Sequence, residues 1–94
     1  MKKVIVYTME GCRHCDDMKK MLIESKIKFT SRDIDKYKKE YDLFVQATDS
    51  EFIPAFMLIT LEEDNKTSNI QLMVPDEDFD DLDEALIKVK RYLN

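Results

Sequence analysis

The residues best suited to chemistry stand together in one short stretch, Gly11-Cys12-Arg13-His14-Cys15. This stretch contains both cysteines, the only glycine and the only histidine of the 94-residue chain. A C-x-x-C pair can cycle between a dithiol and a disulfide, and it can also supply half of a zinc site. A structural zinc ion needs four nitrogen or sulfur ligands, and only His14 could join the two thiols. The pattern favours redox chemistry at Cys12 and Cys15, with metal binding and an inert pair as the alternatives.

The composition indicates a single domain, residues 1–94, working in the cytoplasm. The hydrophobic fraction of 44% is enough for one core, and no segment approaches the length of a membrane span. The apolar run after Met1-Lys2-Lys3 is too short for a signal peptide, so it is interpreted as a buried strand. The net charge is −5 and the basic residues are scattered, which argues against nucleic acid. We therefore expect a monomer without a membrane or nucleic-acid partner.

The elements that must position this stretch follow from the hydrophobic pattern. Apolar runs and alternation predict four strands, and apolar residues spaced at helical intervals predict three helices. The expected strands are 4–7, 27–33, 55–59 and 70–74, and the expected helices are 13–26, 37–48 and 82–93. The order is therefore β-α-β-α-β-β-α, and the first strand ends close to Gly11-Cys12.

This order predicts a mixed sheet. A strand–helix–strand unit at the front implies a parallel pair with a right-handed crossover. The last two strands are joined by a turn at 62–68, where Asp64-Asn65 can take the left-handed conformation, so they are expected to be antiparallel. The resulting fold class is α/β, a four-stranded mixed sheet flanked by helices in a thioredoxin-like arrangement.

Cys12 is expected at the first turn of a helix, where unpaired N–H groups and the helix dipole favour an anion. A stabilised thiolate makes Cys12 the attacking nucleophile, and Cys15, one turn deeper, can resolve the mixed disulfide. Gly11 lets the backbone turn sharply from strand into helix. Positive charge on Arg13 and His14 is expected to favour the reduced form and make the disulfide more oxidising. Alternatively, His14 is an exposed polar residue of a first turn.

Three further motifs complete a pattern that resembles glutaredoxins. They are the strand Val4-Ile5-Val6-Tyr7 before Cys12-x-x-Cys15, Ile53-Pro54 before a strand, and Phe79-Asp80-Asp81-Leu82 opening the last helix. The resemblance covers nearly the whole chain, and it implies that Cys12 is the nucleophile and Cys15 the resolving cysteine.

The resemblance also implies substrate-binding residues. It implies a cis bond at Ile53-Pro54 facing the active site, with the backbone of Ile53 pairing with the bound thiol peptide. It further implies that Asp80 and Asp81 meet the amino end of glutathione. From the residues alone, Pro54 could equally be a trans proline at a strand start, and the aspartates could simply cap a helix.

The chain departs from the common glutaredoxin pattern at three places. Arg13-His14 stands where many members have Pro-Tyr, and Glu77-Asp78 stands where a Gly-Gly pair is usual. Met9 occupies a position that often carries a basic residue for a glutathione carboxylate. These departures predict weaker glutathione binding.

The expected activity is that of a glutaredoxin-like thiol–disulfide oxidoreductase without a bound cofactor or metal. It would reduce protein or glutathione mixed disulfides, such as that of a ribonucleotide reductase. Its electrons would come from glutathione or from a thioredoxin reductase-like donor. Two alternatives stay open: an iron–sulfur cluster or metal carrier that uses Cys12, and a non-catalytic thioredoxin-fold adaptor whose acidic face binds a partner.

Overall fold

The predicted order of elements is confirmed by the computed structural model, which describes residues 1–64 and 66–94. Asn65, half of the expected Asp64-Asn65 turn, lies outside the described residues. The elements are β1 (Lys2–Thr8), α1 (Arg13–Glu24), β2 (Thr30–Asp33), α2 (Lys38–Thr48), β3 (Ala55–Leu61), β4 (Thr67–Met73) and α3 (Leu82–Leu93). The strands form one sheet in the order β2-β1-β3-β4. As expected, β1 and β2 are parallel, and β3 and β4 are antiparallel.

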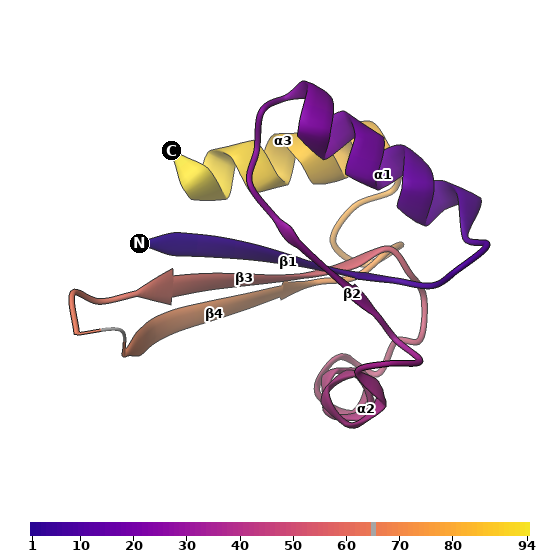
Figure 1. Ribbon diagram of the computed structural model, residues 1–94, viewed down its shortest axis with the longest axis horizontal. Helices are drawn as coiled ribbons and strands as arrows, with labels where there is room; N and C mark the ends of the chain where they lie inside the picture. Colours follow the sequence, from indigo (N-terminus) through magenta and orange to yellow (C-terminus); the bar gives the residue numbers. More distant parts are fainter. Residues whose placement is uncertain (65) are drawn as a thin grey trace.

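Helices cover both faces of the sheet, with α1 and α3 on one side and α2 on the other (Figure 1). Successive side chains of β1 point to opposite faces of the sheet, and because both faces are covered, its apolar run is continuous. Val4 and Val6 belong to the core that includes α1 and α3, and Ile5 and Tyr7 belong to the core beneath α2. Within the described chain, no helix is long and apolar enough to cross a membrane.

The prediction of a strand at 27–33 is wrong in its first half. The hydrogen-bonded strand β2 begins only at Thr30, which pairs with Ile5. Ile27 and Phe29 precede it, yet both pack against the core beneath α1 and α3. The alternation of Ile27 and Phe29 therefore reflects side chains that pack on the core, although the backbone of this segment does not pair with β1. The other strands are longer than predicted or shifted, and β4 begins inside the expected turn, at Thr67.

The sheet register brings three distant segments to one edge. Tyr7 at the end of β1 pairs with Ala55 at the start of β3. Phe56 pairs in turn with Met73 at the end of β4. The loop after β1, the segment before β3 and the loop after β4 must therefore meet at this edge, where the candidate site lies.

A polar network under α2 joins that helix to the sheet. The Tyr7 hydroxyl donates a hydrogen bond of 2.7 Å to Glu40 Oε2, and Arg32 forms an ion pair with the same carboxylate. Burial, followed by the hydrogen bond to Glu40, raises the pKa of Tyr7 above its ordinary range. The Tyr7 ring also packs against Tyr41 and Phe44, with ring centroids 5.6 and 4.8 Å away. The start of α2 is thus attached to the end of β1, an inner strand of the sheet.

Candidate active site

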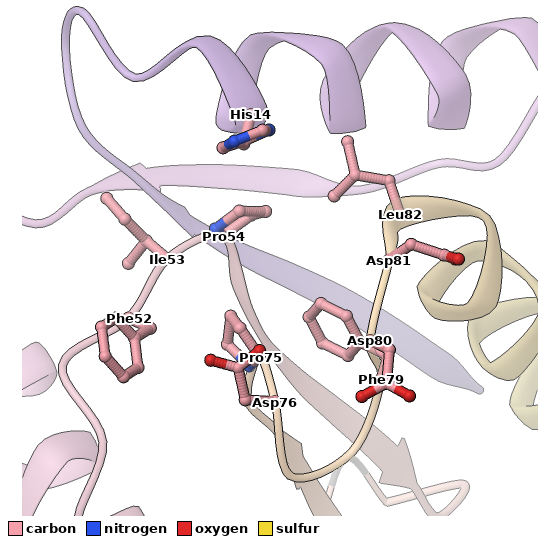
Figure 2. A pocket seen from close by; sticks show the side chains of 10 residues that line it. All are labelled: His14, Phe52, Ile53, Pro54, Pro75, Asp76, Phe79, Asp80, Asp81 and Leu82. Atoms are coloured by element: carbon pink, nitrogen blue, oxygen red, sulfur yellow. The ribbon is translucent and has the colours of Figure 1, made fainter.

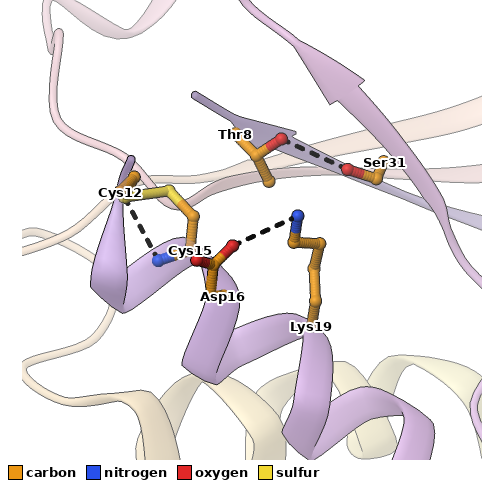
Figure 3. A network of polar contacts seen from close by, with 6 residues as sticks. All are labelled: Thr8, Cys12, Cys15, Asp16, Lys19 and Ser31. Carbon is orange, nitrogen blue, oxygen red and sulfur yellow. Dashed lines mark hydrogen bonds and ion pairs between the residues drawn. A yellow bond between two sulfur atoms is a disulfide. The ribbon is translucent and has the colours of Figure 1, made fainter. Parts of the chain in front are cut away.

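Cys12 and Cys15 form a disulfide at the start of α1, with their Cα atoms 5.2 Å apart. Cys12 is the N-cap residue, and its Sγ accepts a hydrogen bond of 3.2 Å from the backbone N–H of Cys15 (Figure 3). Cys12 is partly exposed, whereas Cys15 is completely buried. A nucleophile must be accessible to the substrate, so of the two sulfurs only that of Cys12 is exposed enough to attack first.

Gly11 makes the turn between β1 and α1. Its φ is +82°, a left-handed conformation that costs other residues energy. The turn is closed by a hydrogen bond of 3.1 Å from the N–H of Cys12 to the carbonyl oxygen of Met9. A Cβ atom on Gly11 would meet nothing within 4 Å, so the backbone conformation, and not lack of space, explains the glycine.

The two residues between the cysteines take different places. Both are exposed, but only His14 lines the adjacent groove, so Arg13 is not among the groove residues. Farther along the same helix, Asp16 and Lys19 form an ion pair of 3.4 Å. At the end of β1, the buried Thr8 hydroxyl lies 3.2 Å from the Ser31 hydroxyl (Figure 3). These contacts fix the frame around the disulfide.

A groove of about 520 Å³ lies beside the disulfide, within the usual range for small-molecule and peptide pockets. His14 from the start of α1 faces Pro54 across it (Figure 2). The Ile53-Pro54 bond is cis, as the resemblance implied, and Pro54 is buried. The groove is lined by His14, Phe52, Ile53, Pro54, Pro75, Asp76, Phe79, Asp80, Asp81 and Leu82. The groove thus brings together His14, Ile53, Pro54, Asp80 and Asp81 of the predicted site, whereas Cys12, Arg13 and Cys15 adjoin His14 in the chain and are not among its lining residues.

The two aspartates of the last motif differ in role. Asp81 is the N-cap of α3, and its carboxylate accepts a hydrogen bond of 2.8 Å from the N–H of Glu84. The Glu84 carboxylate in return accepts a bond of 3.0 Å from the N–H of Asp80. Helix capping therefore explains Asp81, whose carboxylate also borders the groove. It does not explain the Asp80 side chain.

Sequence analysis named Phe79 and Leu82 only within a motif and not as site residues, and it missed three groove residues altogether: Phe52, Pro75 and Asp76. A signal for each existed in the topology. Phe52 immediately precedes the Ile53-Pro54 pair, and Pro75-Asp76 follow a strand that ends at the same sheet edge where β1 ends. Strand direction, rather than composition, could have identified them.

The described residues do not form a metal centre. Among them, no group of three or more histidine, cysteine, aspartate or glutamate side chains could hold a metal ion. What the site offers instead is a partly exposed sulfur at a helix N-terminus and a second, buried sulfur bonded to it. This arrangement is suited to thiol–disulfide exchange, in which one sulfur attacks and the other resolves.

Comparison with known proteins agrees with this chemistry. A protein-family model for glutaredoxins matches residues 4–57, more than half of the chain. The thioredoxin-like protein BC3987 superposes with a TM-score of 0.59 at 17% identity, covering 96% of this chain and 99% of that one. A mutant of the same protein gives a TM-score of 0.59 at 17% identity, with 98% and 100% covered.

A thioredoxin from Thermus thermophilus superposes with a TM-score of 0.53 at 13% identity, covering 98% of this chain and 73% of that one. At these identities the solved structures establish the fold alone. The search of curated proteins found no match. The family match, the thioredoxin-like fold and the Cys12–Cys15 pair together establish that the chain belongs to the glutaredoxin family and is a thiol–disulfide oxidoreductase.

Proposed function

We propose that the protein reduces protein and glutathione mixed disulfides in the cytoplasm, cycling between the Cys12/Cys15 dithiol and the disulfide without a bound cofactor. The observation that carries the proposal is the placement of the pair. The partly exposed Cys12 sulfur caps α1, and His14, between the cysteines, faces the cis Ile53-Pro54 segment across the groove. A cycling pair fits a reducing compartment, where permanent structural disulfides are rare.

The reaction balances as two successive exchanges. The Cys12 thiolate attacks one sulfur of the substrate disulfide, and the other sulfur leaves as a thiolate that takes up a proton. The Cys15 thiol then loses its proton and attacks Cys12 Sγ, which releases the second substrate thiol. Two electrons have passed to the substrate, and the enzyme is left with the Cys12–Cys15 disulfide. Two molecules of glutathione, or a thioredoxin reductase-like donor, would restore the dithiol.

Helix geometry supports the first of these steps. The backbone N–H of Cys15 already points at Cys12 Sγ, at 3.2 Å. When the sulfur carries negative charge, this donor and the N-terminal end of the helix dipole both stabilise it. The burial of Cys15 protects the resolving thiol from the wrong partner until a mixed disulfide forms at Cys12.

The test is reduction of a glutathione mixed disulfide on a small protein by the metal-free enzyme, with two alternative electron sources. One source is glutathione with its reductase, and the other is thioredoxin reductase with NADPH. We expect turnover with at least one source, and loss of turnover in the Cys12→Ser variant. Because serine is a good N-cap residue, this variant keeps the helix start intact.

The Cys15→Ser variant provides the matched control. It should retain the first exchange and accumulate a mixed disulfide on Cys12, detectable by mass spectrometry of the intact protein. Absence of turnover with both electron sources, together with no mixed disulfide in this variant, would contradict the proposed function.

A further inference from the structure

The groove beside the disulfide has an unusual charge. Among its lining residues in the described chain, three carry carboxylates and none is a lysine or arginine; the carboxylates are Asp76, Asp80 and Asp81. His14 is the only lining residue able to carry positive charge, and it stands at the opposite wall (Figure 2). The loop and first turn from 76 to 84 add four more acidic residues. The carboxylates therefore outnumber the groups in the groove lining that can carry positive charge.

Two of the three rim carboxylates have no bonded partner among the described residues. Over residues 1–64 and 66–94, no hydrogen bond or ion pair reaches the carboxylates of Asp76 and Asp80. Among the described residues, Lys88 makes no ion pair with either carboxylate; its Nζ donates to the backbone carbonyl oxygen of Asp78. Asp78 itself turns inward, where its carboxylate accepts a bond of 2.8 Å from the N–H of Val74.

The groove is also apolar enough to hold the stem of a long side chain. Phe52 stands at its edge with 63% of its surface exposed, and Pro75 and Phe79 form further apolar walls. Lysine and arginine combine an apolar stem with a charged end, and a cation is attracted to an aromatic face. Apolar walls with a carboxylate rim therefore complement a basic side chain.

Glutathione is a poor match to the same surface. It carries two carboxylates and one ammonium group at neutral pH, and hence a net negative charge. No guanidinium or ammonium group among the groove residues described here is available to receive those carboxylates. Met9, three residues before Cys12, is 40% exposed and adds only apolar surface.

We propose that this groove selects protein disulfides whose reacting cysteine is flanked by lysine or arginine, and discriminates against anionic disulfides such as those of glutathione. The inference rests on the proposed function and specifies its substrate class. The flanking basic side chain lies along Phe52 and Pro75 and places its charge between Asp76 and Asp80. Cys12 then attacks the substrate sulfur and Cys15 resolves the mixed disulfide as before.

The test uses three small disulfides that differ mainly in charge: cystamine (cationic), bis(2-hydroxyethyl) disulfide (neutral) and 3,3′-dithiodipropionate (anionic). The reduced protein is mixed with each at low ionic strength, quenched with acid and analysed by mass spectrometry. Each rate is divided by that of an uncharged reference thiol, 2-mercaptoethanol, to remove intrinsic reactivity. We expect the normalised rate for cystamine to exceed that for dithiodipropionate about tenfold, and the ratio to shrink in high salt.

Matched variants locate the effect. Asp76→Asn with Asp80→Asn removes two charges with little change in shape and should lower the ratio about threefold or more. Glu62→Gln with Glu63→Gln makes the same change in net charge at the opposite edge of the sheet, and should leave the ratio unchanged. A peptide disulfide with lysines beside its cysteine should likewise react faster than the same peptide with glutamates.

The outcomes separate the two proposals. If none of the three disulfides reacts faster with the reduced protein than with 2-mercaptoethanol, the proposed function is refuted, and the charge selection is refuted with it. If all three react at equal normalised rates, or the anionic probe is fastest, the oxidoreductase stands and the charge selection is overturned. An equal change of the ratio in both double variants would also overturn it, because net charge rather than the groove would then be responsible.

Discussion

Replacing Tyr7 with phenylalanine should destabilise the protein and alter the dependence of its stability on pH. Tyr7 has no exposed surface, and its hydroxyl donates a bond of 2.7 Å to Glu40. Hydrogen bonds to charged groups contribute about 1.5–3 kcal/mol. Glu40 is partly exposed and keeps its ion pair with Arg32, so water can replace part of the lost interaction. We expect a loss of about 1–2 kcal/mol at neutral pH.

The pH dependence follows from the pKa of Tyr7, which burial and the hydrogen bond to Glu40 raise above the ordinary value of 10.0. As the pH rises past that value, tyrosine in the unfolded chain loses its proton first. The unfolded state then binds fewer protons than the folded state, so the free energy of unfolding falls by about 1.4 kcal/mol per pH unit. The stability that Tyr7 contributes through its raised pKa is fully present below pH 10.0, the ordinary tyrosine pKa, and is lost as the pH rises above it.

The Tyr7→Phe variant lacks this loss, so its stability should fall less steeply than that of the wild type above the ordinary pKa of tyrosine. Tyr41, whose pKa burial also raises, is present in both proteins and cancels in the comparison. The assay is urea unfolding of the oxidised protein, followed by circular dichroism from neutral to alkaline pH. Equal slopes in the two proteins would refute the reasoning.

A double-mutant cycle with Glu40→Gln assigns the effect to the pair. The coupling free energy between Tyr7 and Glu40 should be about 1 kcal/mol or more, because the two side chains contact each other directly. Additive losses would show that the Tyr7 hydroxyl and Glu40 are not energetically coupled, and would refute the assignment.

Three further predictions concern the site. His14→Tyr should lower the reduction potential by about 10–20 mV, measured against dithiothreitol or glutathione buffers, because it removes a side chain beside Cys12 that is able to carry positive charge; an unchanged or higher potential would count against this role. Gly11→Ala should reduce stability in urea by about 1 kcal/mol from its φ of +82° alone, and a neutral effect would be inconsistent with a conformational cause. Asp81→Ala should cost about 1 kcal/mol and Asp81→Asn much less, whereas equal losses would argue against capping of α3.

Periodicity and spacing predicted the order of elements because each element buries a face of its own. The helix α3 was predicted at its observed bounds, since its apolar residues follow one helical stripe. The strand at 27–33 was predicted too long because Ile27 and Phe29 are buried without pairing with β1. Hydrophobic alternation reports which side chains are buried and contains no information on which backbone groups find a partner.

The site was predictable only in part for a similar reason. Cys12 and Cys15 stand out in sequence because their types and spacing already contain the chemistry. The acidic wall stands out only in part: the resemblance named Asp80, whereas Asp76 was not predicted, because it joins the groove through its position beside segments more than twenty residues away. The contact between Tyr7 and Glu40 likewise joins residues 33 positions apart. Such contacts arise from the packing of elements that are distant in the sequence and have no local signature.

The sulfur that reacts is also the sulfur that caps α1, and this has a thermodynamic consequence. The four states of the chain, folded or unfolded and reduced or oxidised, form a closed thermodynamic cycle. The reduction free energy therefore differs between the folded and the unfolded chain. This difference equals the difference in free energy of unfolding between the reduced and the oxidised protein. A charged Cys12 sulfur accepts the N–H of Cys15 more strongly than a disulfide sulfur does. Each 1.4 kcal/mol or so of added helix stability in the reduced form corresponds to about 30 mV. The potential of the pair is therefore partly a measure of how firmly the first turn of α1 is held.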